Sequence, residues 1–166
     1  MLTVVFKKHG AVAGFPAKSK NAAAKATYEG MGLFWHENQL DKHFTHAGAR
    51  EYNYAPRQTA EPGARTFARS YTGQKLKKFG HTLPLVKTGQ SRRLCRIRDV
   101  RPSSKGARIV LHARTFNFKN ALSFINMRQE VTSVSKTDEE QLGEAGERLI
   151  QKEADAVRET STKVLK

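Results

Sequence analysis

The feature that most constrains the fold is a long amphipathic pattern with a defined start, late in the chain. Thr137 followed by Glu140 is a capping box, in which a hydroxyl and a carboxylate satisfy the free amide groups of a first helical turn. Apolar residues then recur at helical spacing, at Leu142, Ala145, Leu149 and Val157. The sequence therefore predicts a helix over residues 137–160 that buries one face.

A second helical pattern lies in the N-terminal half. Ser19 precedes a segment rich in helix-forming residues, so we expect a helix to begin near residue 20. Three large residues share one face of it: Tyr28, Met31 and Trp35. Gly30 and Gly32 each cost about 1 kcal/mol relative to alanine, so the helix either stops there or continues because another element packs closely against it. The helical pattern resumes afterwards, at Leu33, Leu40, Phe44 and Ala47.

Short β-type segments flank these helices. Residues 2–6, LTVVF, are β-branched and aromatic and favour a short strand. RRLCRIRDV and ARIVLHA flank the turn-forming RPSSKG, which predicts a β-hairpin over residues 91–113. A last strand is expected near residues 129–134. The predicted fold class is α+β, with a small antiparallel or mixed sheet packed by a helix from the N-terminal half and by the C-terminal helix.

The length of 166 residues predicts one domain. We expect an N-terminal arm at 1–19, a single α+β domain at 20–160 and a tail at 161–166. Residues 50–80 carry prolines, glycines and scattered aromatics without a period, which indicates a long loop with one short helical turn near 65–77. A long loop in a compact domain usually binds something, so this is a candidate interaction loop.

The charge is large and unevenly distributed. Thirty Lys and Arg against fifteen Asp and Glu give a net charge of +15. Residues 1–120 hold 23 basic and 6 acidic side chains, whereas residues 121–166 hold 7 and 9. Such a chain has a basic body and a slightly acidic end, and it suits partners that are nucleic acids or acidic protein surfaces.

Basic side chains gather around the predicted hairpin and are the candidate interface or DNA-facing residues. They are Arg92, Arg93, Arg96, Arg98, Arg101, Lys105 and Arg108. With Arg114 they could line a phosphate track beside aromatic residues that stack on bases, namely Tyr52, Tyr54, Phe116 and Phe118. No recognised nucleic-acid motif accompanies them. We therefore favour a solvated or protein-docking basic face, with four apolar residues of the hairpin turned partly inward: Leu94, Ile97, Ile109 and Leu111.

Three histidines are candidates for a metal site. His36, His43 and His46 fall at helical angles that could share one face. Imidazoles so placed could bind zinc, with Glu37 nearby. However, Leu40 stands where the second histidine of the metalloprotease pattern must be. We interpret the three as polar histidines on a basic or interfacial helix.

The single cysteine is the remaining candidate for chemistry. Arginines flanking Cys95 would lower the pKa of its thiol, but it falls within the predicted hairpin and no partner base can be identified. Phosphate-binding and nucleophile-elbow motifs are missing. The sequence therefore predicts no catalytic residue, no metal and no cofactor. One cysteine and no long apolar run lead us to expect a soluble protein made in a reducing cytoplasm.

Several segments follow one another in a recognisable order. They are LFWHENQLDKHFTHAGAREYNYAPR, the Tyr and Lys of SYTGQKLKKFGH, LPLVKTGQSRR, a hairpin, FNFKNALSFINMRQE and a capped acidic helix. In this order they resemble a class of small virion proteins of tailed bacteriophages, similar to tail-completion, tail-terminator and head–tail connector proteins. The similarity covers roughly residues 25–155, and the Leu-Val-x-Thr-Gly core followed by Ser-Arg is its most recognisable part.

The resemblance implies a structural protein that forms a homo-oligomeric ring at the neck of the particle and has no active site. Expected partners are further copies of itself, other neck, portal or tail proteins, and packaged DNA in the channel, with no membrane. Its expected place is the virion, as a head-completion, adaptor or tail-terminator subunit. The shortest members lack the arm at 1–19, so it stays open whether the arm adds a strand to a neighbour's sheet. The alternative function is a free-standing basic DNA- or RNA-binding module, whose affinity would fall steeply with salt.

Overall fold

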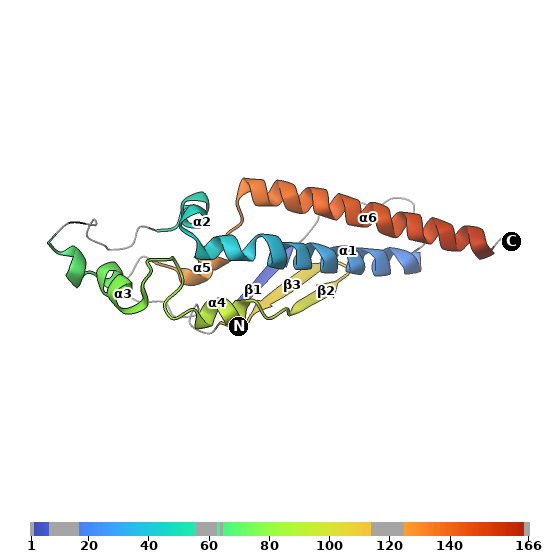
Figure 1. Ribbon diagram of the computed structural model, residues 1–166. Coiled ribbons are helices and arrows are strands. Elements are labelled where there is room, and N and C mark those ends of the chain that lie inside the picture. The colour runs from blue at the N-terminus through green and yellow to red at the C-terminus, as the bar shows by residue number, and fades with distance from the viewer. Residues whose placement is uncertain (1, 7–16, 56–62, 64, 114–124, 165–166) are drawn as a thin grey trace. The chain divides into compact units, whose positions relative to one another are not determined.

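The computed structural model describes residues 2–6, 17–55, 63, 65–113 and 125–164 (Figure 1). The contacts divide the chain into two compact units, and the expected single domain stays a prediction. Each unit is assembled from three separate segments. Unit 1 comprises Met1–Leu2, Leu40–Ile97 and Leu111–Ser133, and unit 2 comprises Thr3–Gln39, Arg98–Val110 and Val134–Lys166.

Unit 2 contains two long helices and a three-stranded sheet. The helices are α1 (Ala17–Asn38) and α6 (Lys136–Val164). The strands β1 (Leu2–Phe6), β2 (Val100–Ser103) and β3 (Gly106–Leu111) are ordered β1-β3-β2 in the sheet. β2 and β3 form an antiparallel hairpin in which Val100 lies opposite Ile109 and Ser103 opposite Gly106. This combination of helices and sheet confirms the predicted α+β class, and β1 confirms the strand expected at residues 2–6.

Helix α1 is the middle layer of unit 2, with contacts to both α6 and β2 (Figure 1). Gly30 faces α6, because a side-chain carbon at this position would lie 2.6 Å from a methyl group of Leu149. Gly32 faces the sheet, because a carbon there would lie 2.8 Å from Val100. Positions two apart on a helix point about 200° from one another. The helix thus continues through both glycines because each lets a neighbouring layer approach closely.

The two helices run antiparallel along their shared interface. Gly146 of α6 approaches Met31 of α1, and the side-chain amide of Gln39 donates a hydrogen bond to the Asp138 carbonyl, at 3.1 Å. Trp35, near the C-terminal end of α1, is fully buried. Burying a side chain of this size dominates local core energetics.

Helix α6 confirms the long C-terminal helix, but its cap is not the one predicted. The Ser135 hydroxyl oxygen accepts a hydrogen bond from the Asp138 amide, at 3.1 Å, so Ser135 is the N-cap. Thr137, the predicted cap, lies exposed inside the first turn. The pattern Ser-x-x-Asp has the spacing of a capping box two residues earlier than Thr137 with Glu140, and the buried Asp138 fills its last position.

Unit 1 is built from short helices. They are η1 (Leu40–Phe44), α2 (His46–Glu51), η2 (Phe67–Arg69), α3 (Tyr71–Phe79), α4 (Gln90–Cys95) and α5 (Met127–Val131). Its core residues are fully or nearly fully buried: Leu40, His43, Phe44, Val86, Cys95, Leu111 and Val131. The helical pattern expected to run on past Leu33 is therefore broken after Asn38 into η1 and α2.

One local motif occurs twice in unit 1. A 3₁₀ turn leads into a hydroxyl N-cap, Thr45 before α2 and Ser70 before α3. Each hydroxyl oxygen accepts from the amide of a glycine three residues later, Gly48 at 3.0 Å and Gly73 at 3.1 Å. The same hydroxyls donate back to a carbonyl of the 3₁₀ turn, at 2.8 and 2.6 Å. Each motif makes a sharp corner whose polar backbone groups are satisfied locally.

Several predicted elements differ from those observed. The hairpin begins at Val100 rather than at residue 91, because residues 90–95 form helix α4. Helix α5 replaces the strand expected near 129–134, and the Asn126 side chain caps it by accepting from the Gln129 amide. Within the expected loop at 50–80, the described residues form η2 and α3, so the expected helical turn is longer and ends later than predicted.

Candidate functional site

The seven basic residues singled out in the sequence do not share one hairpin. Arg92 and Arg93 lie on α4, and Arg96 is its C-cap. Only three of the seven belong to the hairpin itself: Arg101 on β2, Lys105 in the turn and Arg108 on β3. The expectation that all seven gather around one hairpin is therefore wrong. Arg92, Arg93 and Arg96 belong to unit 1, and the other four basic residues belong to unit 2.

In unit 1, one carboxylate holds two of the arginines. Asp41 of η1 accepts from Arg92 Nε at 3.2 Å and from Arg96 Nη2 at 2.6 Å. The Arg92 guanidinium also lies 5.9 Å from the centre of the Phe44 ring, which is fully buried. This arrangement, which we call the Asp41 clamp, fastens α4 to η1.

The clamp shifts the pKa values of Asp41 and Arg96. Burial acts to raise the pKa of Asp41, but hydrogen bonds from Arg96 and Arg92, with their charges, outweigh it and leave the pKa below its usual value. The hydrogen bond to Asp41, followed by the charge of Asp41, raises the pKa of Arg96. The Asp41 carboxylate is therefore ionised at neutral pH.

In unit 2, two more arginines have acidic partners. Arg98 lies 2.5 Å from Glu37 of α1. Arg101 makes a two-pronged contact with Asp99, at 2.8 and 2.9 Å. The Asp99 hydrogen bonds, followed by the Asp99 charge, raise the pKa of Arg101. Such two-pronged pairs fix the orientation of a guanidinium.

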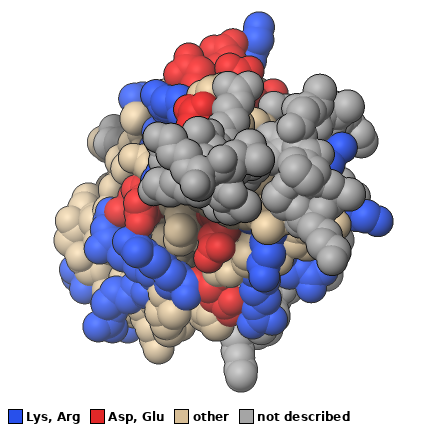
Figure 2. All heavy atoms as spheres, turned by 90° about the vertical axis from the view of Figure 1, so that its right-hand side faces the viewer, with Lys and Arg blue, Asp and Glu red and all other residues tan. Residues whose placement is uncertain are grey.

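The other three basic residues, Arg93, Lys105 and Arg108, are exposed. No described residue forms an ion pair with any of them. Arg108 lies directly opposite Arg101 in the β2–β3 register. Like charges placed so destabilise a strand pair, and the Asp99 contact offsets this in part. On the face that Figure 2 displays, lysine and arginine side chains lie near acidic ones.

The aromatic residues proposed to stack on bases are engaged elsewhere or not described. Tyr52 is buried and stacks on His43, with ring centres 4.0 Å apart and planes 7° apart. The Tyr54 hydroxyl lies 2.6 Å from Nδ1 of the same histidine. Both tyrosines therefore pack inside unit 1. Phe116, Phe118 and Arg114 lie outside the described residues.

The three histidines occupy three different settings. His36 is buried on α1, His43 is fully buried in the stack with Tyr52, and His46 on α2 is exposed and lies 3.1 Å from the Thr82 hydroxyl. Among the described residues, no group of three or more His, Cys, Asp or Glu is placed to hold a metal ion. The zinc alternative therefore has no support in the part of the chain that the structure describes.

Cys95 is the last residue of α4 and is fully buried, so the prediction that it lies in a strand is wrong. Burial raises the pKa of its thiol to about 12, against a smaller opposite effect of the Ala113 backbone. Nearby arginines do not activate it. The interpretation of Cys95 as a small packed residue fits this burial.

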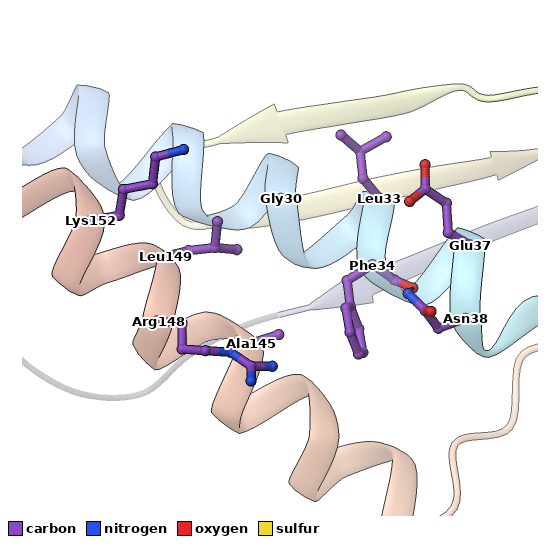
Figure 3. A pocket seen from close by; sticks show the side chains of 9 residues that line it. All are labelled: Gly30, Leu33, Phe34, Glu37, Asn38, Ala145, Arg148, Leu149 and Lys152. Carbon is purple, nitrogen blue, oxygen red and sulfur yellow. Dashed lines mark hydrogen bonds between the residues drawn. The ribbon is translucent and has the colours of Figure 1, made fainter.

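A groove that sequence reasoning missed lies between α1 and α6 (Figure 3). It has a volume of about 350 Å³. Phe34 of α1 points toward α6, and Leu149 points toward α1 beside Gly30 (Figure 3). Arg148 and Lys152 line the α6 side and Glu37 the α1 side. The close approach at Gly30 shapes this groove, and Gly30 is the sequence signal for it, since Gly32 faces the sheet.

Among the described helices, none is both long and apolar enough to cross a bilayer. Comparisons of the chain with protein-family models, with curated proteins and with solved structures find no match.

Proposed function

We propose that this protein is a structural virion protein of a tailed bacteriophage, a ring subunit at the neck that joins the head or portal to the tail. The proposal starts from the ordered segments that resemble neck and tail-completion proteins. It includes no catalytic residue and no cofactor. Its partners are further copies of the chain and other neck, portal or tail proteins, with packaged DNA in the channel.

The observation that carries the proposal is the pairing of the arginines. Four of the seven candidate residues form ion pairs within the protein: Arg92, Arg96, Arg98 and Arg101. A phosphate track needs cations that are available to a nucleic acid. Arg92 and Arg96 instead connect α4 to η1, and Arg98, just before β2, connects to Glu37 of α1. Arg101 pairs with the neighbouring Asp99. These arginines act mainly as parts of a scaffold, which suits a protein that works by its shape.

The most recognisable segment of the resemblance leads into α4, the helix whose arginines hold Asp41. Within LPLVKTGQSRR, Leu85 has a φ of +53° and Gly89 a φ of +81°, both in the left-handed region. A non-glycine residue such as Leu85 occupies that region only when its surroundings impose it. Gly89 then starts α4, and its carbonyl accepts from the Arg93 amide at 3.0 Å. The Thr-Gly turn therefore orients α4 so that Arg92 and Arg96 contact Asp41.

The alternative is a DNA- or RNA-binding module. Arg93, Lys105 and Arg108 favour it, because they are exposed and have no ion-pair partner among the described residues. Their charges could each neutralise a phosphate. The aromatic platform that would accompany them is not available in the described part of the chain, because Tyr52 and Tyr54 pack against His43.

The test is the native mass of the purified protein at two salt concentrations, with and without a short DNA duplex. For a neck subunit we expect a closed oligomer, or a monomer indifferent to the duplex. A monomer or dimer that binds the duplex with a steep salt dependence would replace this proposal with the alternative. Ring-shaped particles in electron micrographs of the oligomer would separate a closed ring from an open aggregate.

A further inference from the structure

The outer face of α6 carries a row of like charges. Glu140, Glu144 and Glu147 are spaced by four and three residues, so they lie on one side of the helix, and all three are exposed. Leu142 and Ala145 lie on the other side, buried toward α1. Within the described part of the chain none of the three glutamates forms an ion pair. We call them the acidic stripe.

The outer face of the hairpin carries the opposite charge. Ala107 and Ile109 of β3 lie near Gly32, on the side of the sheet that faces α1. Since successive strand residues alternate between faces, Arg108 points away from α1. Arg101 is its cross-strand partner and shares that side, and Lys105 occupies the turn. Asp99 holds the Arg101 guanidinium, so Lys105 and Arg108 are the cations left for a partner, and we call these two the basic face.

The two surfaces lie on opposite outer layers of unit 2. Helix α1 is the middle layer, with α6 on one side and the sheet on the other (Figure 1). One unit therefore presents negative charge on its helical layer and positive charge on its sheet layer. Each surface places like charges side by side, which weakens the isolated fold and is relieved when opposite charge approaches.

We propose that the acidic stripe of one copy docks on the basic face of the next copy. This inference rests on the proposed ring function and names the two surfaces that meet in it. Contact between two different patches of identical chains is heterologous, and repetition of such a contact closes a ring when the rotation allows it. A nucleic acid would satisfy only the basic face and would be repelled by the acidic stripe, whereas a second copy satisfies both.

The experiment reverses each surface in turn. One variant carries Glu144→Lys and Glu147→Lys, and the other carries Lys105→Glu and Arg108→Glu. All four side chains are exposed, so we expect both variants to fold with unchanged circular dichroism. Each variant alone confronts like charges at the interface, and the protein concentration at half-association should rise roughly tenfold or more.

Mixing the two variants is the decisive test. The lysines of the first variant then meet the glutamates of the second, and the unaltered stripe and face meet in the other contact, so the mixture should recover association. Matched controls reverse exposed charges elsewhere: Glu29→Lys with Glu51→Lys, and Lys20→Glu with Lys25→Glu. These controls should associate like the natural sequence.

The outcomes separate this inference from the function on which it rests. If the natural protein forms an oligomer that both variants retain, the two surfaces are not the contact, while the ring function stands. If the natural protein stays monomeric up to its solubility limit and binds duplex, both proposals fail. If the hairpin variant loses duplex binding and keeps its mass, the basic face serves nucleic acid and the docking contact is overturned.

Discussion

At the scale of single residues, two glycines mark places where backbone meets backbone. An added side-chain carbon at Gly48 would lie 2.0 Å from the Lys42 carbonyl oxygen, and one at Gly73 would lie 1.9 Å from the Phe67 carbonyl oxygen. Gly30 and Gly32 differ, because there the neighbouring atoms belong to side chains that can move. The Lys42 and Phe67 carbonyls accept hydrogen bonds from the capping hydroxyls, so they cannot move without breaking the turn.

Replacing Gly48 by alanine should therefore destabilise the protein. We expect the free energy of unfolding to fall by about 1 to 3 kcal/mol, the usual cost of forcing extra atoms into a packed site. Gly143→Ala is the matched control, because an added carbon there meets nothing within 4 Å and the residue is exposed on α6. This control should raise stability by about 0.5 to 1 kcal/mol. Urea denaturation of both variants measures the difference, and equal effects would contradict the steric argument.

At the scale of elements, the two long helices are predictable from the sequence, whereas most of the short helices are not. Periodicity over many residues specifies α1 and α6. Helix α4 is expected to be a strand because RRLCRIRDV and ARIVLHA flank the turn-forming RPSSKG as strands flank a hairpin loop. Its structure depends on Gly89 and on Asp41, which lies 51 residues from Arg92 in the chain. Local reading of a sequence carries no information on such a partner.

Separation along the sequence also explains why most of the candidate site could not be predicted. The basic residues were identified from composition, but their acidic partners Glu37 and Asp41 lie in segments that the sequence does not connect to them. The groove between α1 and α6 likewise depends on which helix faces meet. The predicted cap at Thr137 missed Ser135 by two residues because both offer a hydroxyl before an acidic side chain three positions on.

The Asp41 clamp should make the free energy of unfolding depend on pH in the acidic range. The pKa of Asp41 is lowered in the folded protein, so its contribution is present above the unfolded pKa, near 3.8, and is lost as pH falls through the folded value. Asp41→Asn should reduce the free energy of unfolding at pH 7 by at most about 1 kcal/mol, because the carboxylate is nearly half exposed.

Thermal melting at several pH values tests this dependence. The gap between the natural protein and Asp41→Asn should close as the pH is lowered below the folded pKa of Asp41. Glu29→Gln, which removes an exposed carboxylate on α1, serves as the control and should give no such gap at neutral pH. A gap that persists unchanged in acid would mean that Asp41 acts through something other than its charge.

At the scale of the whole molecule, the chain passes repeatedly between the two units. Each unit draws on three segments, so neither can be cut out as one continuous piece. The only tryptophan, Trp35, is buried in unit 2, and the only cysteine, Cys95, is buried in unit 1. The protein thus contains one natural probe of folding in each unit.

We expect both probes to report one transition. Tryptophan fluorescence follows unit 2, and alkylation of Cys95 follows unit 1, because a buried thiol with a pKa of about 12 reacts only once it is exposed. In a urea series the two midpoints should coincide, as for a cooperative unfolding transition. A Cys95→Ala variant gives the background of the labelling reaction. Labelling at lower urea than the fluorescence change would show that unit 1 opens first.

The three-layer order of unit 2 also governs when the unit can be completed on the ribosome. Helix α1 ends at Asn38, whereas α6, which covers it, begins at Lys136 and is synthesised after both α1 and the hairpin. Chains emerge with their N-terminal parts first. A nascent chain therefore displays its basic hairpin before its acidic stripe exists. Under the docking arrangement proposed above, it can receive a finished neighbour but cannot itself extend the assembly until translation has passed α6.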